Sequence, residues 1–310
     1  MAVDQAPRSL TRPGIPLGLI DRLMLGYLGV VIVIAATRLD QRPWAAWVIG
    51  ANLLLIALVY LVHRPGLGRF GRTLREIYPI VLLPALYGSL DLLNGPGVRT
   101  WDAVVQGWEA AIFGGQVSRT WWQSSPSAFW SVTLHAVYFA YYFIVPFPIV
   151  VFLWRGEIGR ARTAAAIVVA TFLAHYLCFL LLPVAGPYYE FPRPTGEFVD
   201  NWAARLVYAI LSGGSSYGAA FPSSHVAATF AASIATWLGD RRLGMLLLVP
   251  TLLMTVGVVY CQMHYAVDAL AGLLVAIPIT WVVVRWGNDE GPAGAGPSPA
   301  ARTAALTARR

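Results

Sequence analysis

Long apolar runs recur along the whole chain, and they limit the possible fold more than any other feature of the sequence. A helix needs about 20 mostly apolar residues to cross the hydrocarbon core of a bilayer. Stretches of roughly this length cover residues 17–36, 44–62, 77–93, 129–154, 163–183, 222–238, 245–260 and 265–286. Backbone polar groups must be paired inside a bilayer, so segments of this kind fold as helices. The sequence therefore predicts an all-α, polytopic membrane helical bundle with eight spans, in which Pro146 and Pro148 kink the fourth span.

The basic residues are distributed as topology signals. All 22 of them are Arg, and 57% of the residues in the chain are hydrophobic. With the N-terminus inside, sixteen arginines fall in inner segments and six in outer ones, so the positive-inside rule predicts two cytoplasmic termini. The net charge of +7 is scattered between apolar segments and forms no basic stripe, so we expect no nucleic-acid partner. In this topology residues 184–221 and the turn before the last span share the outer membrane face.

Two further segments stand outside the spans. The connection 94–128 is too long for a simple turn, and Trp101 to Phe113 reads as an amphipathic segment that lies in the membrane interface. Residues 287–310 are rich in Gly, Ala, Pro and Ser, a composition that predicts a disordered cytoplasmic tail.

A histidine and an aspartate four residues apart, His264 and Asp268, stand at the mouth of the last span. On a helix this spacing places both side chains on one face, so that the carboxylate accepts a hydrogen bond from one ring nitrogen. The other ring nitrogen then keeps its lone pair free for nucleophilic attack. The alternative is a polar pair that only satisfies itself at a helix end. Ionisable residues in membrane segments are functional by default, which favours the chemical interpretation.

A second patch, residues 221–225, opens the sixth span with the sequence Phe-Pro-Ser-Ser-His. Pro222 suits a first helical turn, and Ser223 and Ser224 can cap the helix or leave its backbone N–H groups open. A helix N-terminus with open N–H groups binds phosphate, and His225 beside it could give a proton to a leaving oxygen. A simple capped transmembrane helix has the same pattern, so the second histidine patch is what favours a catalytic site.

The loop ahead of this patch has a rigid, proline-rich turn. We take its candidate substrate-contacting residues to be Gly186, Pro187, Tyr188 and Tyr189. Arg193 supplies a fixed cation of the type that holds phosphate by two parallel hydrogen bonds. For Arg193 and for Arg205, the other arginine of this loop, a structural role at the interface is the alternative. No cluster of His, Cys, Asp and Glu has metal-ligand spacing, so we expect metal-independent chemistry without a cofactor.

At these residues the chain resembles the type 2 phosphatidic acid phosphatase superfamily. The second and third motifs of the family centre on Pro-Ser-Gly-His and on His-x-x-x-Asp, and here they read Pro222 to His225 and His264 to Asp268. The resemblance implies a six-helix catalytic core over residues 71–286. Residues 1–70 would then form an N-terminal tail and two additional transmembrane helices.

The resemblance also implies a role for each site residue. His264 would attack phosphorus and form a phosphohistidine or its phosphodiester equivalent, while Asp268 orients its ring. His225 would protonate the leaving alcohol and then activate the acceptor. The phosphoryl oxygens would be held by Ser223, Ser224 and Arg193.

Departures from the family pattern point to one of its branches. The first family motif begins with Lys and ends in Arg-Pro; this chain has no Lys, although Arg193-Pro194 stands in the right loop. Gly257-Val258 replaces the Ser-Arg that usually precedes the third-motif histidine. The branch of inositol phosphorylceramide synthase and its inositolphosphotransferase-like relatives is similar to this chain at residues 108–114, 186–189 and 260–268.

The function expected from the resemblance is that of an integral-membrane lipid phosphotransferase or phosphatase at the outer face of a bacterial plasma membrane. Its partners would be a membrane lipid phosphate and a hydroxyl acceptor from a lipid, a sugar or water. With water as acceptor it would be a plain lipid phosphate phosphatase for phosphatidate or polyprenyl phosphate. A non-enzymatic transporter or scaffold is the alternative from another class, although a transporter would place its ionisable pairs at the midplane. The sequence leaves the acceptor and the oligomeric state open.

Overall fold

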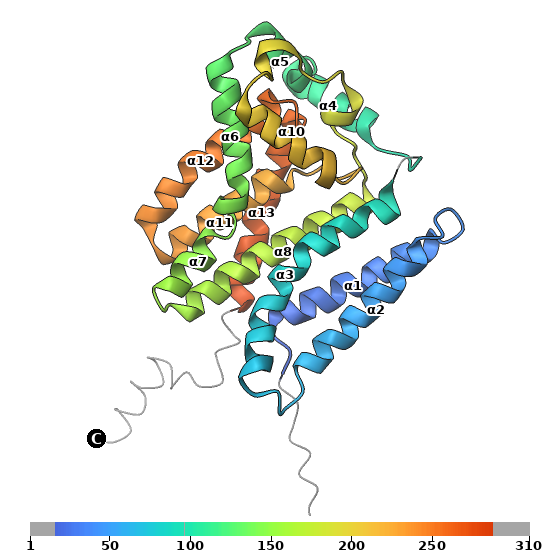
Figure 1. Cartoon of the computed structure of the whole chain (residues 1–310), viewed down its shortest axis with the longest axis vertical. Helices are drawn as coiled ribbons and strands as arrows, with labels where there is room; N and C mark the ends of the chain where they lie inside the picture. The colour runs from blue at the N-terminus through green and yellow to red at the C-terminus, as the bar shows by residue number, and fades with distance from the viewer. Residues whose placement is uncertain (1–15, 96, 288–310) are drawn as a thin grey trace, which may run out of the picture.

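The computed structural model describes residues 16–95 and 97–287, and the regular secondary structure in these residues is helical (Figure 1). The helices are α1 (Leu19–Thr37), α2 (Ala45–Val62), α3 (Gly68–Asn94), α4 (Asp102–Phe113), α5 (Val117–Ser124), α6 (Ala128–Ile144), α7 (Phe147–Trp154), α8 (Ile158–Leu181), α9 (Pro187–Glu190), the 3₁₀ turn η1 (Gly196–Phe198), α10 (Trp202–Gly214), α11 (Ser224–Gly239), α12 (Arg241–Tyr260) and α13 (Ala266–Gly287). Within the described residues the only β-type pairing is one parallel bridge between Val184 and Ala219. The predicted all-α fold is confirmed.

Six of the described helices are long and apolar enough to cross a membrane, namely α1, α2, α3, α8, α12 and α13. A seventh span forms if α6 and α7 are taken together, since they meet at a bend of 46°. Pro146 lies in the break between the two helices and Pro148 at the start of α7, as the predicted kink requires. The remaining predicted span, the sixth along the chain, is α11, whose 16 residues give a helix of only about 24 Å. The chain is an integral membrane protein, but α11 is a short central helix.

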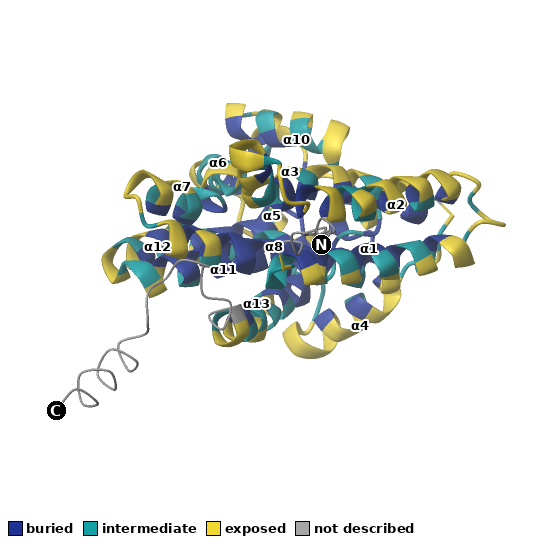
Figure 2. Cartoon of the chain, turned by 90° about the horizontal axis from the view of Figure 1, so that it is seen from below, coloured by how far each residue is buried: buried dark blue, intermediate teal, exposed yellow. Residues whose placement is uncertain are grey.

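Helices α8 and α11 form the centre of the bundle, and Figure 2 shows them mostly buried while exposed residues lie on the outer helices. Helix α8 packs against α1, α3, α7, α11 and α13, and α11 packs against α8, α12 and α13. Alanines line the buried faces of both central helices, and small side chains let neighbouring membrane helices approach closely. The two helices therefore support the turns that connect them to the rest of the bundle.

The hairpin of α1 and α2 belongs to the same core as α3 and α8. Its turn is fixed by Arg38, whose guanidinium donates to Asn94 Oδ1 at 2.8 Å and to the Leu180 carbonyl oxygen at 2.5 Å. The amide of Asn94 in turn donates to the Phe179 carbonyl oxygen at 2.7 Å. The contacts to Phe179 and Leu180 satisfy carbonyl groups at the C-terminal end of α8 that have no partner within their own helix.

A cap of short helices covers one end of the bundle, at the top of Figure 1, and it includes α4, α5 and α10. Helix α4 occupies the segment for which an amphipathic helix is predicted. Helix α10 is not predicted from the sequence; the Asn201 side chain caps it by accepting a hydrogen bond from the Ala204 N–H at 2.9 Å. The expected disordered tail, residues 287–310, lies outside the described residues apart from Gly287.

Candidate active site

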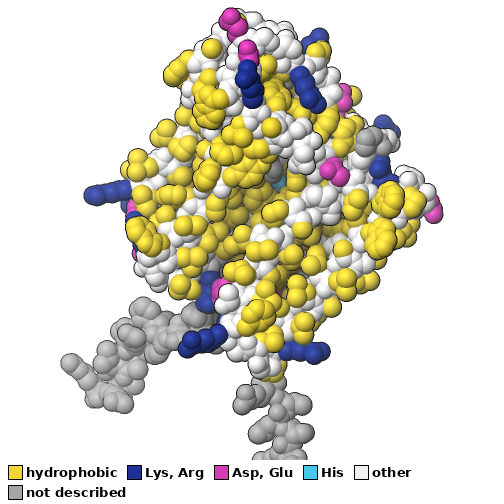
Figure 3. Space-filling view, viewed as in Figure 1, with side chains coloured by type: hydrophobic (Ala, Val, Ile, Leu, Met, Phe, Trp, Pro, Cys, Tyr) yellow, Lys and Arg dark blue, Asp and Glu magenta, His cyan; other side chains and the backbone are white. Residues whose placement is uncertain are grey.

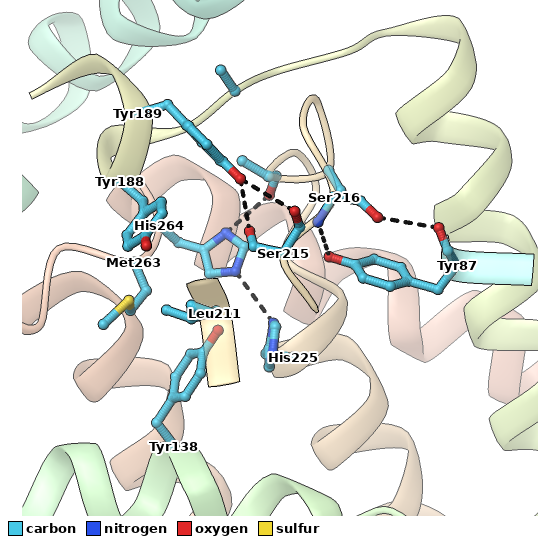
Figure 4. A pocket seen from close by; sticks show the side chains of 13 residues that line it. Tyr87, Tyr138, Tyr188, Tyr189, Leu211, Ser215, Ser216, His225, Met263 and His264 are labelled. Atoms are coloured by element: carbon cyan, nitrogen blue, oxygen red, sulfur yellow. Dashed lines mark hydrogen bonds between the residues drawn. The ribbon is translucent and has the colours of Figure 1, made fainter. Parts of the chain in front are cut away.

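The two histidine patches meet at this capped end of the bundle. His264 lies in the turn between α12 and α13, and His225 lies in the first turn of α11. Nε2 of His264 is 3.4 Å from Nδ1 of His225, although the two residues are 39 positions apart (Figure 4). The convergence predicted from the sequence is therefore present in the structure.

A direct backbone contact joins the beginnings of α11 and α13. The Ser223 N–H donates to the main-chain carbonyl oxygen of Asp268 at 3.0 Å. Gly272 packs so closely on this junction that a Cβ atom there would lie 2.5 Å from the Ser223 carbonyl oxygen. The two motifs are consequently fixed relative to each other by main chain, before any side chain is considered.

The local structure of both motifs differs from the prediction. Pro222 does not occupy a first helical turn, because α11 begins at Ser224, and Ser223 is its N-cap with Oγ accepting from the Val226 N–H at 3.4 Å. His264 and Asp268 do not share a helical face either, because α13 begins only at Ala266. A capping turn brings them together, in which the Asp268 carboxylate accepts from the Tyr265 N–H at 2.8 Å.

The hydrogen-bond network assigns the protonation of the His264 ring. Nδ1 of His264 lies 3.0 Å from the Ala220 carbonyl oxygen and 3.4 Å from Oδ2 of Asp268. Both neighbours only accept hydrogen bonds, so Nδ1 carries the proton and the Nε2 lone pair faces His225. Asp268 is thus the more distant of two acceptors that fix the ring, and the main chain of Ala220 is the nearer one.

His225 is held between aromatic rings. Its imidazole stacks on Tyr138 with centroids 4.7 Å apart and an interplanar angle of 26°. The Tyr141 ring lies on it at 4.5 Å and 43°. Since the His264 lone pair faces Nδ1 of His225, that nitrogen carries the proton of the contact. The site therefore holds one nitrogen with a free lone pair and one N–H group side by side.

A cavity of about 40 Å³ lies beside the two histidines. Its lining carries many hydroxyl groups, from Tyr87, Tyr138, Tyr188, Tyr189, Ser215 and Ser216. The wall is braced by hydrogen bonds from the Tyr189 hydroxyl to Ser215 Oγ at 3.1 Å and from the Ser216 N–H to the Tyr87 hydroxyl at 3.1 Å (Figure 4). Apart from the two histidines, every residue that lines this cavity is uncharged.

The face of the molecule seen in Figure 3 is covered mainly by hydrophobic side chains, and a histidine side chain is visible in a hollow among them. Exposed apolar residues of this kind face acyl chains in a membrane protein.

The predicted substrate loop lies at the cavity. Tyr188 and Tyr189 line it, and Pro187 begins α9 just behind them. Gly186 has a φ of +85°, and a Cβ atom there would lie 2.7 Å from the Ala220 side chain. Glycine is required at this position both for the backbone conformation and for the close approach.

Arg193 is a predicted site residue that does not line the cavity, and the same holds for Ser223, Ser224, Asp268, Gly186 and Pro187. The Arg193 guanidinium lies over the Tyr188 ring, 4.1 Å from the centroid, in a cation–π contact. With Arg205 it lines a separate open pocket of about 390 Å³. Arg205 itself pairs with Asp200. The phosphate-binding role of Arg193 stays a prediction, as do the roles of Ser223 and Ser224, which are both buried.

Three residues at the site are not singled out by the sequence. Asp102 and Glu109 on α4 are buried carboxylates that accept hydrogen bonds from the backbone of the two site turns. Burial raises the pKa of Glu109, while hydrogen bonds from the N–H groups of Val267 and Ser118 act in the opposite direction. Only the spacing of polar residues on an otherwise apolar helix could have indicated them.

Gln262 is the third of these residues, and it precedes the nucleophile candidate by two positions. It is buried with a φ of +60°, a conformation that a residue with a side chain adopts only when its surroundings enforce it. Its Oε1 accepts from the Trp122 indole N–H at 2.8 Å, and its Nε2 donates to the Pro192 carbonyl oxygen at 2.9 Å. Gln262 thus links the His264 turn to α5 and to the loop after α9.

Comparison with known proteins identifies one family. The family model described as PAP2 superfamily matches residues 110–282, more than half of the chain, and includes both histidine motifs. No curated protein and no solved structure matches the chain. Among the described residues, no group of three or more His, Cys, Asp and Glu side chains is arranged to hold a metal ion.

Proposed function

The chain belongs to the PAP2 superfamily, so its function is of the lipid phosphatase or phosphotransferase kind, and we propose that it transfers a phospho head group between membrane lipids through a phosphohistidine. The observation that supports this most directly is the contact of 3.4 Å between Nε2 of His264 and Nδ1 of His225. It pairs a free lone pair with a proton donor, as attack on phosphorus and protonation of a leaving oxygen require.

The reaction has two steps. In the first, Nε2 of His264 attacks phosphorus, the bond from phosphorus to the leaving oxygen breaks, and His225, which enters this step as the imidazolium ion, gives that oxygen a proton and becomes neutral. The Ala220 carbonyl and the Asp268 carboxylate, which face the Nδ1–H group of His264, stabilise the positive charge that forms on its ring. In the second step His225 takes the proton of the acceptor hydroxyl, which attacks phosphorus and releases His264.

The substrate must change the geometry of the site when it binds. A near-attack arrangement places phosphorus about 3 to 3.5 Å from the attacking atom, with the leaving oxygen on the far side. No phosphoryl group fits between two nitrogens that are 3.4 Å apart. The two rings therefore separate as the phosphoryl group enters, and their contact describes the resting enzyme.

Developing negative charge needs donors around the phosphoryl oxygens. The N–H groups of Ser224 and His225 lie in the first turn of α11, where they have no earlier partner in the helix. Ser223 holds this turn through its cap, and the cavity hydroxyls provide further donors. Arg193 would act from the other side of the Tyr188 ring, as a cation near the mouth of the site.

The charge of the cavity supports a phosphodiester donor over a phosphomonoester. A phosphomonoester is close to a dianion at neutral pH, and the burial of charge without a paired cation is unfavourable. Apart from the two histidines, this cavity is lined by uncharged residues. A phosphodiester monoanion is the better match, which agrees with the resemblance to the inositol phosphorylceramide synthase branch. The alternative is a plain lipid phosphate phosphatase in which water is the acceptor.

We place the catalytic core at residues 71–286 and the site on the extracytoplasmic side of a bacterial plasma membrane. The distribution of arginines supports this orientation. The cap with α4, α5 and α10 lies at the opposite end of the bundle from the start of α1 (Figure 1). Both termini would then be cytoplasmic, and residues 1–70 would add two spans to the core.

The test uses the full-length protein in phosphatidylcholine nanodiscs with EDTA present. Two head-group-labelled probes, [³²P]phosphatidylinositol and [³²P]phosphatidate, are compared with and without ceramide as acceptor. We expect label from the diester probe in a new lipid, together with an acid-labile, base-stable phosphoprotein. His264→Ala should lose both signals, whereas His63→Gln, which alters a histidine that contacts Asp21 far from the site, should keep them. Turnover by folded His264→Ala protein would refute the mechanism, and release of free phosphate from phosphatidate alone would favour the phosphatase.

A further inference from the structure

Helix α4 turns a polar stripe toward the protein. Asp102, Gln106 and Glu109 follow one another at intervals of four and three residues, so they share one face of the helix. Asp102 and Glu109 are 3% and 0% exposed. Trp108 and Ile112 are 48% and 61% exposed, and Figure 2 shows α4 at the edge of the molecule with much of its surface exposed. The stripe therefore buries two carboxylates beneath an apolar outer face.

The carboxylate of Asp102 joins both walls of the site. Its Oδ2 accepts from the Ala185 N–H at 2.8 Å, and its Oδ1 accepts from the Gly186 N–H at 2.8 Å. The Tyr265 hydroxyl also donates to Oδ1, at 3.0 Å. One side chain thus holds the loop ahead of Tyr188 and the residue that directly follows His264.

Glu109 holds the other end of the same turn. Its Oε2 accepts from the Val267 N–H at 3.2 Å, in the first turn of α13, and its Oε1 accepts from the Val117 N–H at 3.1 Å. An anion at a helix N-terminus also interacts favourably with the helix dipole. Glu109 therefore fixes the start of the helix that carries Asp268.

We propose that Asp102 and Glu109 are positioning residues, which hold the His264 turn and the Gly186 loop in register for the transfer step; this inference rests on the function proposed above. Neither carboxylate has a hydrogen bond to the His264 or the His225 ring. They act through the backbone N–H groups of residues 185, 186 and 267 and through the Tyr265 hydroxyl, and each carboxylate oxygen accepts at least one hydrogen bond.

The ionised form is essential to this arrangement. A carboxylate accepts hydrogen bonds at both oxygens, whereas a carboxamide of the same shape has one acceptor and one donor group. In Asp102→Asn or Glu109→Gln, at least one backbone N–H therefore meets another N–H. The turn that carries His264 should then move while the surrounding bundle remains packed.

The experiment compares Asp102→Asn and Glu109→Gln with Glu197→Gln, which removes an exposed carboxylate in η1. Rates with [³²P]phosphatidylinositol and ceramide are measured per folded molecule in phosphatidylcholine nanodiscs, alongside the melting temperature. A misplaced reacting group lowers kcat on the order of 100-fold, and we expect this loss for Asp102→Asn with little change in KM. The Glu197→Gln control should match the wild type. A variant that melts earlier but keeps the wild-type kcat would show a merely structural role and overturn the proposal.

A second readout is independent of turnover. Hydrogen–deuterium exchange of the backbone at residues 185–186 and 265–267 should be faster in both variants than in the wild type, with exchange in α8 unchanged. Unchanged exchange at those residues would overturn the positioning role, whether or not the wild type acts on the lipid probes. Lack of wild-type activity on these probes would refute the proposed function and not the positioning role. If Asp102→Asn does not fold, Glu109→Gln and Tyr265→Phe, which removes one donor to Asp102, provide the same comparison.

Discussion

The junction between α11 and α13 gives the sharpest test of how the site is held, through the substitution Gly272→Ala. A Cβ atom at residue 272 would lie 2.5 Å from the Ser223 carbonyl oxygen and 3.4 Å from the Ala227 nitrogen. Both neighbours belong to the backbone of the turn that carries His225, so no side-chain rotation can relieve the contact. The helix starts must move apart.

The size of the effect follows from the geometry. Ordinary van der Waals contact begins at 3.4 Å, so α11 and α13 must separate by about 0.9 Å at this point. Overpacking of a close contact costs about 1–3 kcal/mol, and Ala recovers at most about 1 kcal/mol of that through its helix propensity. The Ser223 to Asp268 hydrogen bond lies in the same junction. A displacement of about 1 Å in a catalytic site lowers the rate on the order of 100-fold.

The assay measures transfer rate per folded molecule and melting temperature for Gly272→Ala and Gly26→Ala in the same nanodiscs. Gly26 is a matched control, because it lies inside α1 with no atom within 4 Å of its added Cβ. We expect Gly26→Ala to match or exceed the wild type in stability and to match it in rate. Wild-type rate and melting temperature in Gly272→Ala would refute the idea that this close contact fixes the distance between the histidines.

Further substitutions test the individual roles. His225→Asn should lower lipid turnover by about 10²- to 10⁴-fold, as expected for loss of a general acid, yet still form the phosphoprotein from a p-nitrophenyl phosphodiester, whose leaving group needs no proton; a burst of p-nitrophenol checks this. Arg193→Ala should raise KM for the anionic donor about 10-fold through loss of a charged contact, whereas Arg205→Ala should not, and equal KM values would remove Arg193 from phosphate binding. Gln262→Ala should lower the unfolding free energy by about 2 kcal/mol, since it removes two part-buried hydrogen bonds, to the Trp122 indole and to the Pro192 carbonyl. Gln262→Gly should lower it less, because glycine relieves the positive φ, and thermal unfolding of both variants compares these costs.

The bundle and the pairing of its histidines could be predicted from sequence because they depend on strong local signals. Apolar runs of membrane length predict helices, and proline pairs predict bends. His225 and His264 each stand at the start of an apolar run, so a shared membrane face follows from counting spans. The detail within each motif could not be predicted, since a histidine four residues before an aspartate fits a helical face and a capping turn equally well. In the structure α13 starts at Ala266, after His264, so the motif forms the capping turn and not a shared helical face.

The contacts of the buried carboxylates on α4 could not be predicted from the sequence, for a different reason. Asp102 contacts Ala185 and Gly186, more than eighty residues further along the chain, and only the packed bundle brings them together. The direction in which an interfacial helix turns its polar face is also ambiguous. An amphipathic helix at a membrane surface usually places its polar residues in water, whereas α4 buries its carboxylates and exposes Trp108 and Ile112.

The buried carboxylates also affect which substrate charge the site favours. Asp102, Glu109 and Asp268 are all buried around the site, and their hydrogen bonds include backbone N–H groups that would otherwise be donors for an anion. Every residue that lines the cavity except the two histidines is uncharged. Because each carboxylate repels a second negative charge on the substrate, a dianionic phosphomonoester meets a less favourable field than a diester does. If the chain acts as proposed above, these buried carboxylates favour a diester donor over a phosphomonoester.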